Sequence, residues 1–304
     1  PHLLEGTRQE PRNPRQKTSG ITKSGRRIVI RNIIVVSDTH AGCQLGLFPP
    51  SFKLDSGGLY KPSILQRKVW SMWEHFWGEW VPLVTKKEPY IVVHNGDAID
   101  GKHHDAVTQI TQNITDQVAI AEALLRPIVK GNRCAGYYHI RGTEAHVGKS
   151  GQAEEQLAKN LGAIPDEIGN HARWELWMRL NGNLIHFSHH IGCTGSASYE
   201  STAVYKEMIE AYVDASRWGK QPPNVIVRSH RHRAIKVEVP TETGYGIALV
   251  TPGFQLKTPN THRFALGRSS MPQIGGILIR HGDEDTIFTR SKVWNIERPR
   301  EVVL

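Results

Sequence analysis

The sequence predicts an α/β fold in which one domain combines a mixed or doubled β-sheet with flanking helices. Three observations lead to this prediction. Short β-branched runs typical of buried strands recur along the chain, helical periodicity falls mostly in its first half, and groups able to bind metals directly follow several strand runs. Since no internal repeat or clear linker interrupts the pattern, we expect residues 27–304 to form a single domain.

Composition and charge are those of an ordinary globular protein with anionic partners. Of the 304 residues, 38% are hydrophobic and 22% are charged, so the chain can bury a substantial core. The net charge of +9 favours phosphorylated substrates or nucleic acid. Much of that charge lies in residues 1–26, which we expect to be a flexible basic tail, with a nucleic-acid-binding arm as the alternative.

Cysteine usage and hydropathy bear on location. The three cysteines, Cys43, Cys134 and Cys193, are far apart and lack metal-type spacing, which fits a reducing cytoplasm better than a disulfide framework. No stretch approaches the roughly 20 apolar residues that span a bilayer, and the N-terminus lacks the apolar core of a signal peptide. We therefore expect a cytoplasmic protein that does not enter a membrane.

The first half of the chain alternates strands with helices. Residues 27–37 are a β-branched run that predicts a buried strand, residues 42–62 are rich in Gly, Pro and Ser and predict a loop, and residues 63–84 have helical periodicity with Ser63 as N-cap. Further strands are expected at 90–94 and 137–140, and further helices at 114–129 and from about residue 152.

Four tryptophans of the 63–84 helix recur at spacings of three and four, which places them on one face. They are Trp70, Trp73, Trp77 and Trp80. Such a stripe could stack nucleic-acid bases. At helical spacing it more often packs against a core, which is what we expect here.

The second half of the chain is rich in strands. They are expected at 173–180, 183–188, 225–228, 234–239, 247–250, 276–280 and 286–289. A helix over about 198–217 interrupts them. The segment 193–222 around this helix could form a helical cap over the site.

Potential metal ligands stand at four strand ends. They are Asp38 with His40, Asp97, His189 with His190, and His230 with His232. One such residue alone more often caps a turn or faces water, but several together at strand ends are hard to explain by packing. Loops after strand C-termini are where α/β proteins place their sites, and two carboxylates with several imidazoles suit first-row divalent metals.

Spacing within these groups also favours a metal site. In Asp38-Thr39-His40 and His230-Arg231-His232, side chains two residues apart point to one side of an extended chain, so each strand end could supply two ligands to one cavity. The Asp97 carboxylate could bridge two metals roughly 3.5–4 Å apart, a separation suited to phosphoryl transfer.

The motifs resemble those of the calcineurin-like metallophosphoesterases, whose ordered pattern is D-x-H, G-D-x-x-D, G-N-H-(E/D), a lone His often followed by Gly, and G-H-x-H. The similar stretches are Asp38-Thr39-His40, Gly96-Asp97-Ala98-Ile99-Asp100, Gly142-Thr143-Glu144, Ser188-His189-His190 and Ser229-His230-Arg231-His232. All five occur in order, each after an apolar strand, between residues 38 and 232.

The resemblance implies a four-layer αββα sandwich of two mixed β-sheets flanked by helices. It also implies that Asp38, His40 and His232 hold one metal and that His230 and one histidine of the doublet hold the other, with Asp97 bridging. His189 fits the doublet position better than His190, because His190 then stands where the family often has Gly.

The third motif departs from the family pattern. Thr143 stands where the family has an Asn that ligates the second metal, and a hydroxyl is the weaker neutral ligand. Glu144 stands where the family has the histidine that assists the leaving group. His146 could replace that histidine, with Glu144 orienting it or acting directly as a general acid, unless both are surface loop residues.

Residues flanking the motifs are weaker candidates for binding substrate. They are Asn95, Arg141, His104 and Arg231. Arginine suits bidentate contact with phosphate, although it also commonly pairs with carboxylates. The residues around His104 fit a solvated loop at least as well as a contact with substrate phosphate.

The expected function is metal-dependent hydrolysis of phosphate esters by a metal-bridging hydroxide. The expected cofactors are two divalent transition metals, Mn²⁺ foremost, with Fe, Zn, Ni or Co also suited to the ligands. The basic charge favours phosphodiesters, including nucleic acid. The alternatives are a phosphomonoesterase and a non-catalytic interaction module that retains the fold.

Overall fold

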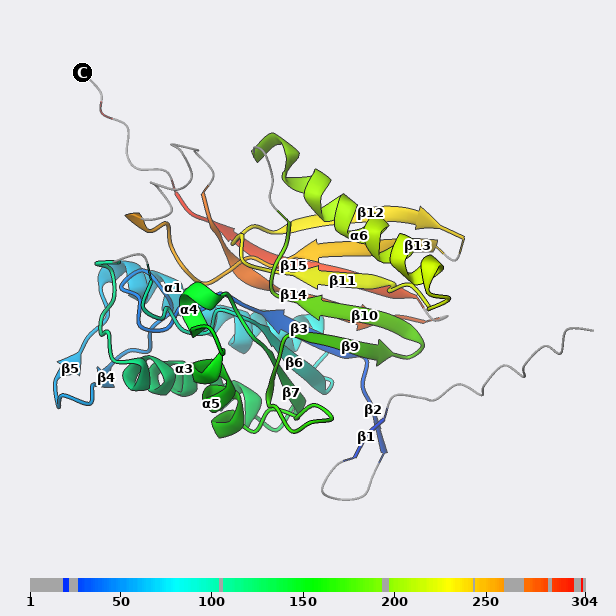
Figure 1. The fold of residues 1–304 in the computed structure, drawn as a ribbon. Helices are drawn as coiled ribbons and strands as arrows, with labels where there is room; N and C mark the ends of the chain where they lie inside the picture. The colour runs from blue at the N-terminus through cyan, green and yellow to red at the C-terminus, as the bar shows by residue number, and fades with distance from the viewer. Residues whose placement is uncertain are drawn as a thin grey trace, which may run out of the picture.

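The structure is a computed structural model, drawn as a ribbon in Figure 1. It describes residues 19–21, 27–103, 106–192, 197–242, 244–259, 271–283, 286–297 and 302. Most of the predicted tail, His104 and residues 193–196 of the predicted cap lie outside these ranges. Within the tail segment, β1 (Ser19–Ile21) pairs antiparallel with β2 (Arg27–Val29).

The larger sheet has six strands in the order β15-β14-β3-β6-β7-β8. Strands β3, β6, β7 and β8 run parallel, while β14 and β15 extend the β3 side antiparallel. The strands are β3 (Asn32–Val36), β6 (Tyr90–Asn95), β7 (Cys134–Ile140), β8 (Ala172–Arg173), β14 (Gln273–His281) and β15 (Ile287–Asn295). The predicted 27–37 strand is therefore two strands, β2 and β3, separated at residues 30–31.

The smaller sheet has five strands in the order β12-β13-β11-β10-β9. Its three central strands run parallel, and β9 and β12 close the two sides antiparallel. The strands are β9 (Glu175–Leu180), β10 (Asn183–Ser188), β11 (Val225–Arg228), β12 (Ile235–Thr241) and β13 (Gly244–Val250). A separate hairpin of β4 (Phe52–Lys53) and β5 (Leu59–Tyr60) lies in the segment predicted as a loop.

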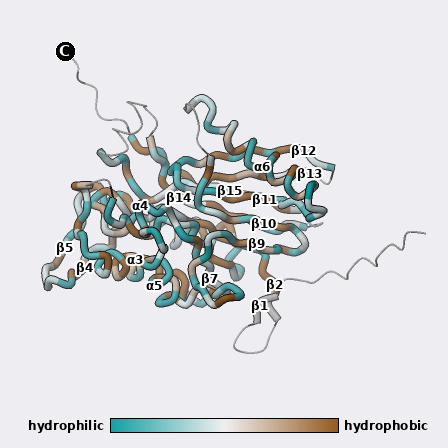
Figure 2. The backbone as a smooth tube through the Cα atoms, in the orientation of Figure 1, coloured by the Kyte–Doolittle hydropathy of each residue, from teal (hydrophilic) through white to brown (hydrophobic). Residues whose placement is uncertain are grey.

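The two sheets pack face to face between layers of helix, which is the four-layer αββα sandwich (Figure 1). Alternate residues of β3 enter different layers: Ile33 and Val35 pack against the smaller sheet, whereas Ile34 and Val36 pack against helices. Both faces of β3 are thus apolar. In Figure 2, brown segments run through the strands of the two sheets.

The helix predicted at 63–84 is observed in three continuous parts: α1 (Ile64–His75), a π-helical turn (Phe76–Trp80) and α2 (Val81–Val84). Ser63 caps it with a capping box completed by Gln66. The tryptophan stripe faces the core, since Trp73 and Trp80 are buried and the other two pack against the same cluster. The packing interpretation of the stripe is confirmed.

The remaining helices cover the outer faces of the two sheets. They are α3 (Ile114–Val129), the short α4 (Glu144–Val147), α5 (Gln152–Leu161), a 3-10 turn (Ala197–Tyr199) and α6 (Glu200–Arg217). Helix α6, suggested above as part of a cap over the site, packs along β12 and β13 through Val204 and Met208 and so forms an outer layer of the sandwich. In the part of the chain that is described, no helix is long and apolar enough to cross a membrane.

Candidate metal centre

Five strands of the two sheets deliver their carboxyl ends to one place. Strands β3, β6 and β7 lead to Asp38, Asp97 and Thr143, and strands β10 and β11 of the other sheet lead to His189 and His230. Parallel strands end together at one edge of a sheet, and here the edges of two packed sheets meet. Segments almost two hundred residues apart therefore contribute to one site.

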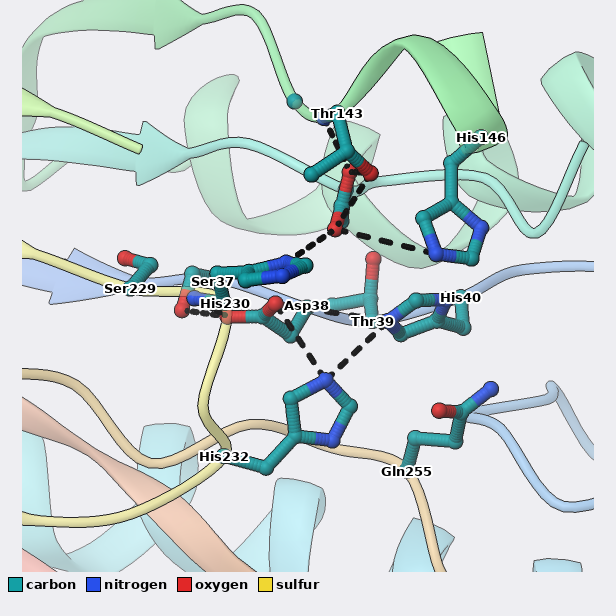
Figure 3. Close-up of polar contacts among 12 residues, drawn as sticks. Ser37, Asp38, Thr39, His40, Thr143, His146, Ser229, His230, His232 and Gln255 are labelled. Carbon is teal, nitrogen blue, oxygen red and sulfur yellow. Dashed lines mark hydrogen bonds and ion pairs between the residues drawn. The ribbon is translucent and has the colours of Figure 1, made fainter. Parts of the chain in front are cut away.

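Asp38, His40 and His232 form a first set of ligands, here named the Asp38 group (Figure 3). The His232 Nε2 lies 3.3 Å from Asp38 Oδ1 and 3.2 Å from His40 Nε2. The His40 Nε2 lies 4.0 Å from Asp38 Oδ1. One oxygen and two nitrogens thus converge within the reach of a single cation.

Asp97, His189 and His230 form a second set, here named the Asp97 group. The His189 Nε2 lies 3.0 Å from Asp97 Oδ2, and the His230 Nδ1 lies 3.7 Å from the same oxygen. His190 is exposed, whereas His189 is buried. Of the doublet, the structure therefore brings His189 to Asp97 and leaves His190 on the surface.

The two groups adjoin each other. The backbone N–H of His230 faces Asp38 Oδ2 at 3.4 Å while its ring faces Asp97. His230 thus joins the Asp38 group through its backbone and the Asp97 group through its side chain.

The donor set fits divalent metal ions. Asp38 Oδ1 and His189 Nε2 are buried and make no hydrogen bond of good geometry among the described residues, and each faces another candidate ligand, His232 Nε2 at 3.3 Å and Asp97 Oδ2 at 3.0 Å. Carboxylate oxygen and imidazole nitrogen are the ligands that first-row transition metals accept. A cation in each group would satisfy these atoms.

The electrostatics of the site keep its carboxylates ionised. Burial by itself would raise the pKa of Asp97, yet the His189 and His146 rings hold it well below its usual value. Burial would likewise lower the pKa of His189, but Asp97 outweighs it and raises that pKa to about 10. The protein therefore pairs Asp97 with a protonated His189 when no metal is bound, and a metal must displace that proton.

Other residues orient the ligand rings. The Asp100 Oδ1 lies 3.3 Å from His40 Nδ1, which leaves His40 Nε2 to face His232. The backbone carbonyl of Asn95 accepts from His189 Nδ1 at 2.7 Å, which directs His189 Nε2 to Asp97. Contacts of this kind fix the tautomer and the angle of a metal-binding histidine. Asp100 stands in the second motif, but nothing in the sequence alone assigned it this contact.

Thr143 contacts the candidate bridging carboxylate. Its backbone N–H donates to Asp97 Oδ1 at 2.7 Å, and its hydroxyl donates to Asp97 Oδ1 and Oδ2 at 3.0 and 3.2 Å. In this arrangement Thr143 holds Asp97 by two donors. The Thr143 hydroxyl therefore contacts the Asp97 carboxylate, whereas the sequence suggested that it would bind the second metal directly.

His146 lies beside the site, whereas the Glu144 side chain is exposed at the start of α4. The His146 Nδ1 is 2.7 Å from the backbone oxygen of Asp100, and its Nε2 is 3.9 Å from Asp97 Oδ2. Because a carbonyl only accepts, Nδ1 carries the proton and the neutral ring presents a lone pair at Nε2. Burial lowers the pKa of His146 to about 4, which also favours the neutral ring. This geometry suits an acceptor better than the proton donor suggested by the sequence.

The structure does not bring all four suggested substrate residues to the ligands. Arg141 donates to the Ala172 and Ser150 carbonyls and to Glu155, and its guanidinium lies over Trp174. The Asn95 amide donates to Ser188 O and to Ser229 Oγ beneath the site. These contacts tie segments of the fold together.

Arg231 and His104 complete that set of four. Arg231 is partly exposed between the two histidines of the last motif and donates to the backbone carbonyls of Gly192 and Glu200. His104 lies outside the described residues.

The ligand loops have a left-handed backbone. Among the described residues, eight that are not glycine have positive φ, and five of them are candidate ligands: Asp38, His40, Asp97, His230 and His232. Such a residue costs about 1–3 kcal/mol and persists where the surroundings enforce it, most often at functional sites. The extended chain assumed above for the two D/H-x-H segments is therefore wrong: each ligand is directed by a turn.

The close approach of the Thr143 loop to Asp97 requires a glycine at position 142. A Cβ on Gly142 would lie 2.0 Å from Asp97 Oδ1 and 2.3 Å from its backbone nitrogen. The loop of Thr143 can thus approach Asp97 only because residue 142 has no side chain.

Comparisons with known proteins add little to this geometry. No protein-family model matches the chain, and no curated protein matches it. Solved structures that do match include an uncharacterized predicted phosphoesterase from Streptococcus pneumoniae, which is 11% identical with a TM-score of 0.32 and covers 88% of this chain and 98% of its own.

Two further matches are of the same quality. Vps29 from Chaetomium thermophilum is 10% identical with a TM-score of 0.40, covering 89% of this chain and 99% of that one. The sulfate thiohydrolase SoxB from Thermus thermophilus is 10% identical with a TM-score of 0.40, and the match covers 87% of this chain and 56% of SoxB. Likenesses this distant carry no functional argument, so the function must be argued from the side chains.

Proposed function

We propose that this chain is a dinuclear metal phosphoesterase of the calcineurin-like type. The observation that carries the proposal is the meeting of two Asp/His ligand groups at the common edge of two sheets, with Asp97 facing three histidine rings. Buried carboxylate and imidazole atoms that face one another without a well-formed hydrogen bond support a bound cation in each group.

Asp38, His40 and His232 would hold one metal, His189 and His230 the other, and Asp97 would contact both. Bound divalent ions, which we propose to be Mn²⁺, would supply Lewis-acid stabilisation of a phosphoryl group and a more acidic water. Asp100 and the Asn95 carbonyl keep the His40 and His189 rings aimed at those ions.

The chain's own polar groups would act on the substrate around this centre. His146 offers a lone pair at Nε2 and is held by Asp100 O, so it would accept a proton or a hydrogen bond beside the reacting phosphate. The exposed half of His230 and the neighbouring His190 mark the open side from which substrate would enter.

The substrate we propose is a phosphodiester, with nucleic acid as one candidate. Support comes from the net charge of +9 and from Arg231 and Arg233, which flank the last ligand. Both guanidinium groups already have partners in the fold, since Arg233 pairs with Glu200 and Arg231 donates to the Gly192 and Glu200 carbonyls. The free cysteines Cys43 and Cys134 support our further proposal of a reducing, cytoplasmic setting.

Metal analysis followed by two model substrates tests the function. We expect protein purified without chelator, or reloaded with Mn²⁺, to hold about two ions per chain and to hydrolyse bis-p-nitrophenyl phosphate faster than p-nitrophenyl phosphate. Preference for the monoester would replace the diesterase by a phosphomonoesterase.

One observation favours a second candidate, a non-catalytic module that retains the fold. Thr143 binds Asp97 at the position where the family has a metal-ligating Asn. If the protein holds less than one ion per chain and Mn²⁺ restores no hydrolysis, this candidate replaces the enzyme.

A further inference from the structure

Helix α5 places a buried carboxylate directly behind the ligand loops. Glu154 is fully buried, and each of its oxygens accepts a backbone N–H from a different loop. Oε1 accepts from Ala98 at 2.7 Å, and Oε2 accepts from Gly142 at 2.6 Å. Charge-assisted bonds of this length are among the stronger hydrogen bonds in proteins.

The two N–H groups are next to the residues that matter for the Asp97 group. Ala98 follows Asp97, and Gly142 precedes Thr143, whose N–H and hydroxyl donate to Asp97. Glu154 therefore closes a ring of contacts that runs from one loop to the other and back through the Asp97 carboxylate. Glu154 and Thr143 together set how far apart these loops lie.

A packing role alone would not require a charge at this place. Removing a carboxylate from water is costly unless hydrogen bonds replace the lost solvation. The bonds from two loops do so here, and the buried His139 adds a third polar neighbour, with Nε2 at 3.6 Å from Oε1 and Nδ1 at 2.6 Å from the Tyr137 hydroxyl. Two layers of polar residues thus lie behind the candidate ligands.

We infer that Glu154 is a positioning residue of the metal centre, which sets the geometry of the Asp97 group directly and reaches the Asp38 group only through the Asp97 loop. This inference rests on the proposed function insofar as the centre binds metal. Asp38 has its own contact with Ser37, while the Asp38 loop is joined to the Asp97 loop by backbone hydrogen bonds and by the approach of Asp100 to His40.

The neighbouring Glu155 supplies a matched control. It is also on α5 and also accepts backbone N–H groups, but those of His171 and Ala172, together with Arg141. In Glu154→Gln the new NH₂ group faces a backbone N–H that needs an acceptor, so one loop is released. In Glu155→Gln the same chemical change occurs away from the ligands.

The first readout is Mn²⁺ binding to metal-stripped protein by titration calorimetry. Loss of a residue that supports a ligand typically weakens binding about 10–100-fold, so we expect Glu154→Gln to lose that much at one of two sites and clearly less at the other, while Glu155→Gln keeps both. Wild-type affinity at both sites in Glu154→Gln would overturn the inference.

The second readout needs no metal and no activity. In metal-free Glu154→Gln, hydrogen exchange should become faster in the peptide that contains residue 98 and in the peptide that contains residue 142. In Glu155→Gln, exchange in these two peptides should match that of wild type. Unchanged exchange would overturn the inference. If Glu154→Gln does not fold, Glu154→Asp keeps the charge but cannot span both loops, and it should show the same split between the two sites.

These results separate the inference from the proposed function. If wild-type protein binds two ions but hydrolyses no phosphate ester, the proposed enzymatic function is refuted and the positioning role of Glu154 still stands. An active wild type whose Glu154→Gln variant binds both ions normally would refute the role and leave the enzyme.

Discussion

The Asp38 group and the Asp97 group differ in how open they are to solvent. In the Asp38 group the side chains are 0, 2 and 16% exposed, whereas in the Asp97 group His230 is 45% exposed beside two buried partners. A ligand with one side in water can admit a substrate oxygen or a water at its metal. In the proposed enzyme, substrate would therefore reach the centre from the Asp97 side.

The two groups also differ in what supports them. Asp38 is held by the Ser37 hydroxyl of its own loop, and His40 faces Asp100 of the Asp97 loop. Asp97 is held by Thr143 from another strand, and both loops depend on Glu154. The Asp97 group should therefore be the more easily weakened half of the centre.

The largest effect is expected from Asp97→Asn, which removes the carboxylate proposed to contact both metals. Diesterase activity should fall about 1000-fold, because several kcal/mol of transition-state stabilisation by metal are lost. Steady-state rates at saturating Mn²⁺ measure this. Asp214→Asn, on the exposed face of α6, is the matched control. Activity of Asp97→Asn close to that of the control would remove Asp97 from the centre.

The next largest effect distinguishes the two histidines of the doublet. His189→Ala should weaken one of the two Mn²⁺ sites by about 100-fold or more, since a ligand is lost and a buried Asp97 is left unpaired. His190→Ala should stay within about twofold of wild type, as expected for a surface residue. Titration calorimetry on both variants decides, and the reverse order would exchange their roles.

A smaller effect is expected from Thr143→Val, which keeps the shape but removes the hydroxyl donor to Asp97. Losing a hydrogen bond to a charged group costs about 1.5–3 kcal/mol, so the weaker Mn²⁺ site should lose roughly tenfold or more in affinity. Thr143→Ser should recover most of it. If the Thr143→Val variant binds Mn²⁺ as tightly as the wild-type protein, the Thr143 hydroxyl does not support Asp97.

The smallest effect on catalysis is expected from Arg141→Ala. Arg141 holds the Ser150 and Ala172 carbonyls and Glu155 together. The free energy of unfolding, measured in urea, should therefore drop by about 1–2 kcal/mol, while kcat/KM stays within about twofold of wild type. A tenfold fall in kcat/KM with unchanged stability would instead place Arg141 at the substrate.

The strand and helix pattern was largely readable from the sequence. The helix at 114–129 and the strands at 183–188 and 225–228 have the predicted bounds, because continuous apolar runs and an Asn113 cap determine them locally. The predicted 27–37 strand missed a break, since residues 30–31 carry no turn signal. The β4–β5 hairpin was missed for the opposite reason, because its two-residue strands lie among many Gly, Pro and Ser turn signals.

The candidate ligands were also readable, but not the contacts between them. Asp, His and strand ends identify Asp38, Asp97, His189 and His232 as a set. The roles suggested for Arg141 and Thr143 rested on their position in a motif, and the structure directs Arg141 to Glu155 and Thr143 to Asp97. Side chains of this reach find the nearest partner in space, which a motif does not specify.

The sequence by itself determined most strand ends and the kinds of ligand atom, because each depends on local hydrophobic periodicity and on residue identity. Two sheets and the division of His230 and His232 between two metals followed only from the family resemblance. Only the tertiary structure decided that the candidate ligands meet at one edge, that five of them have a left-handed backbone, and that Glu154 joins two loops. Those features depend on the packing of one sheet against another, which brings together residues far apart in the chain and supplies the contacts that hold a strained turn in place.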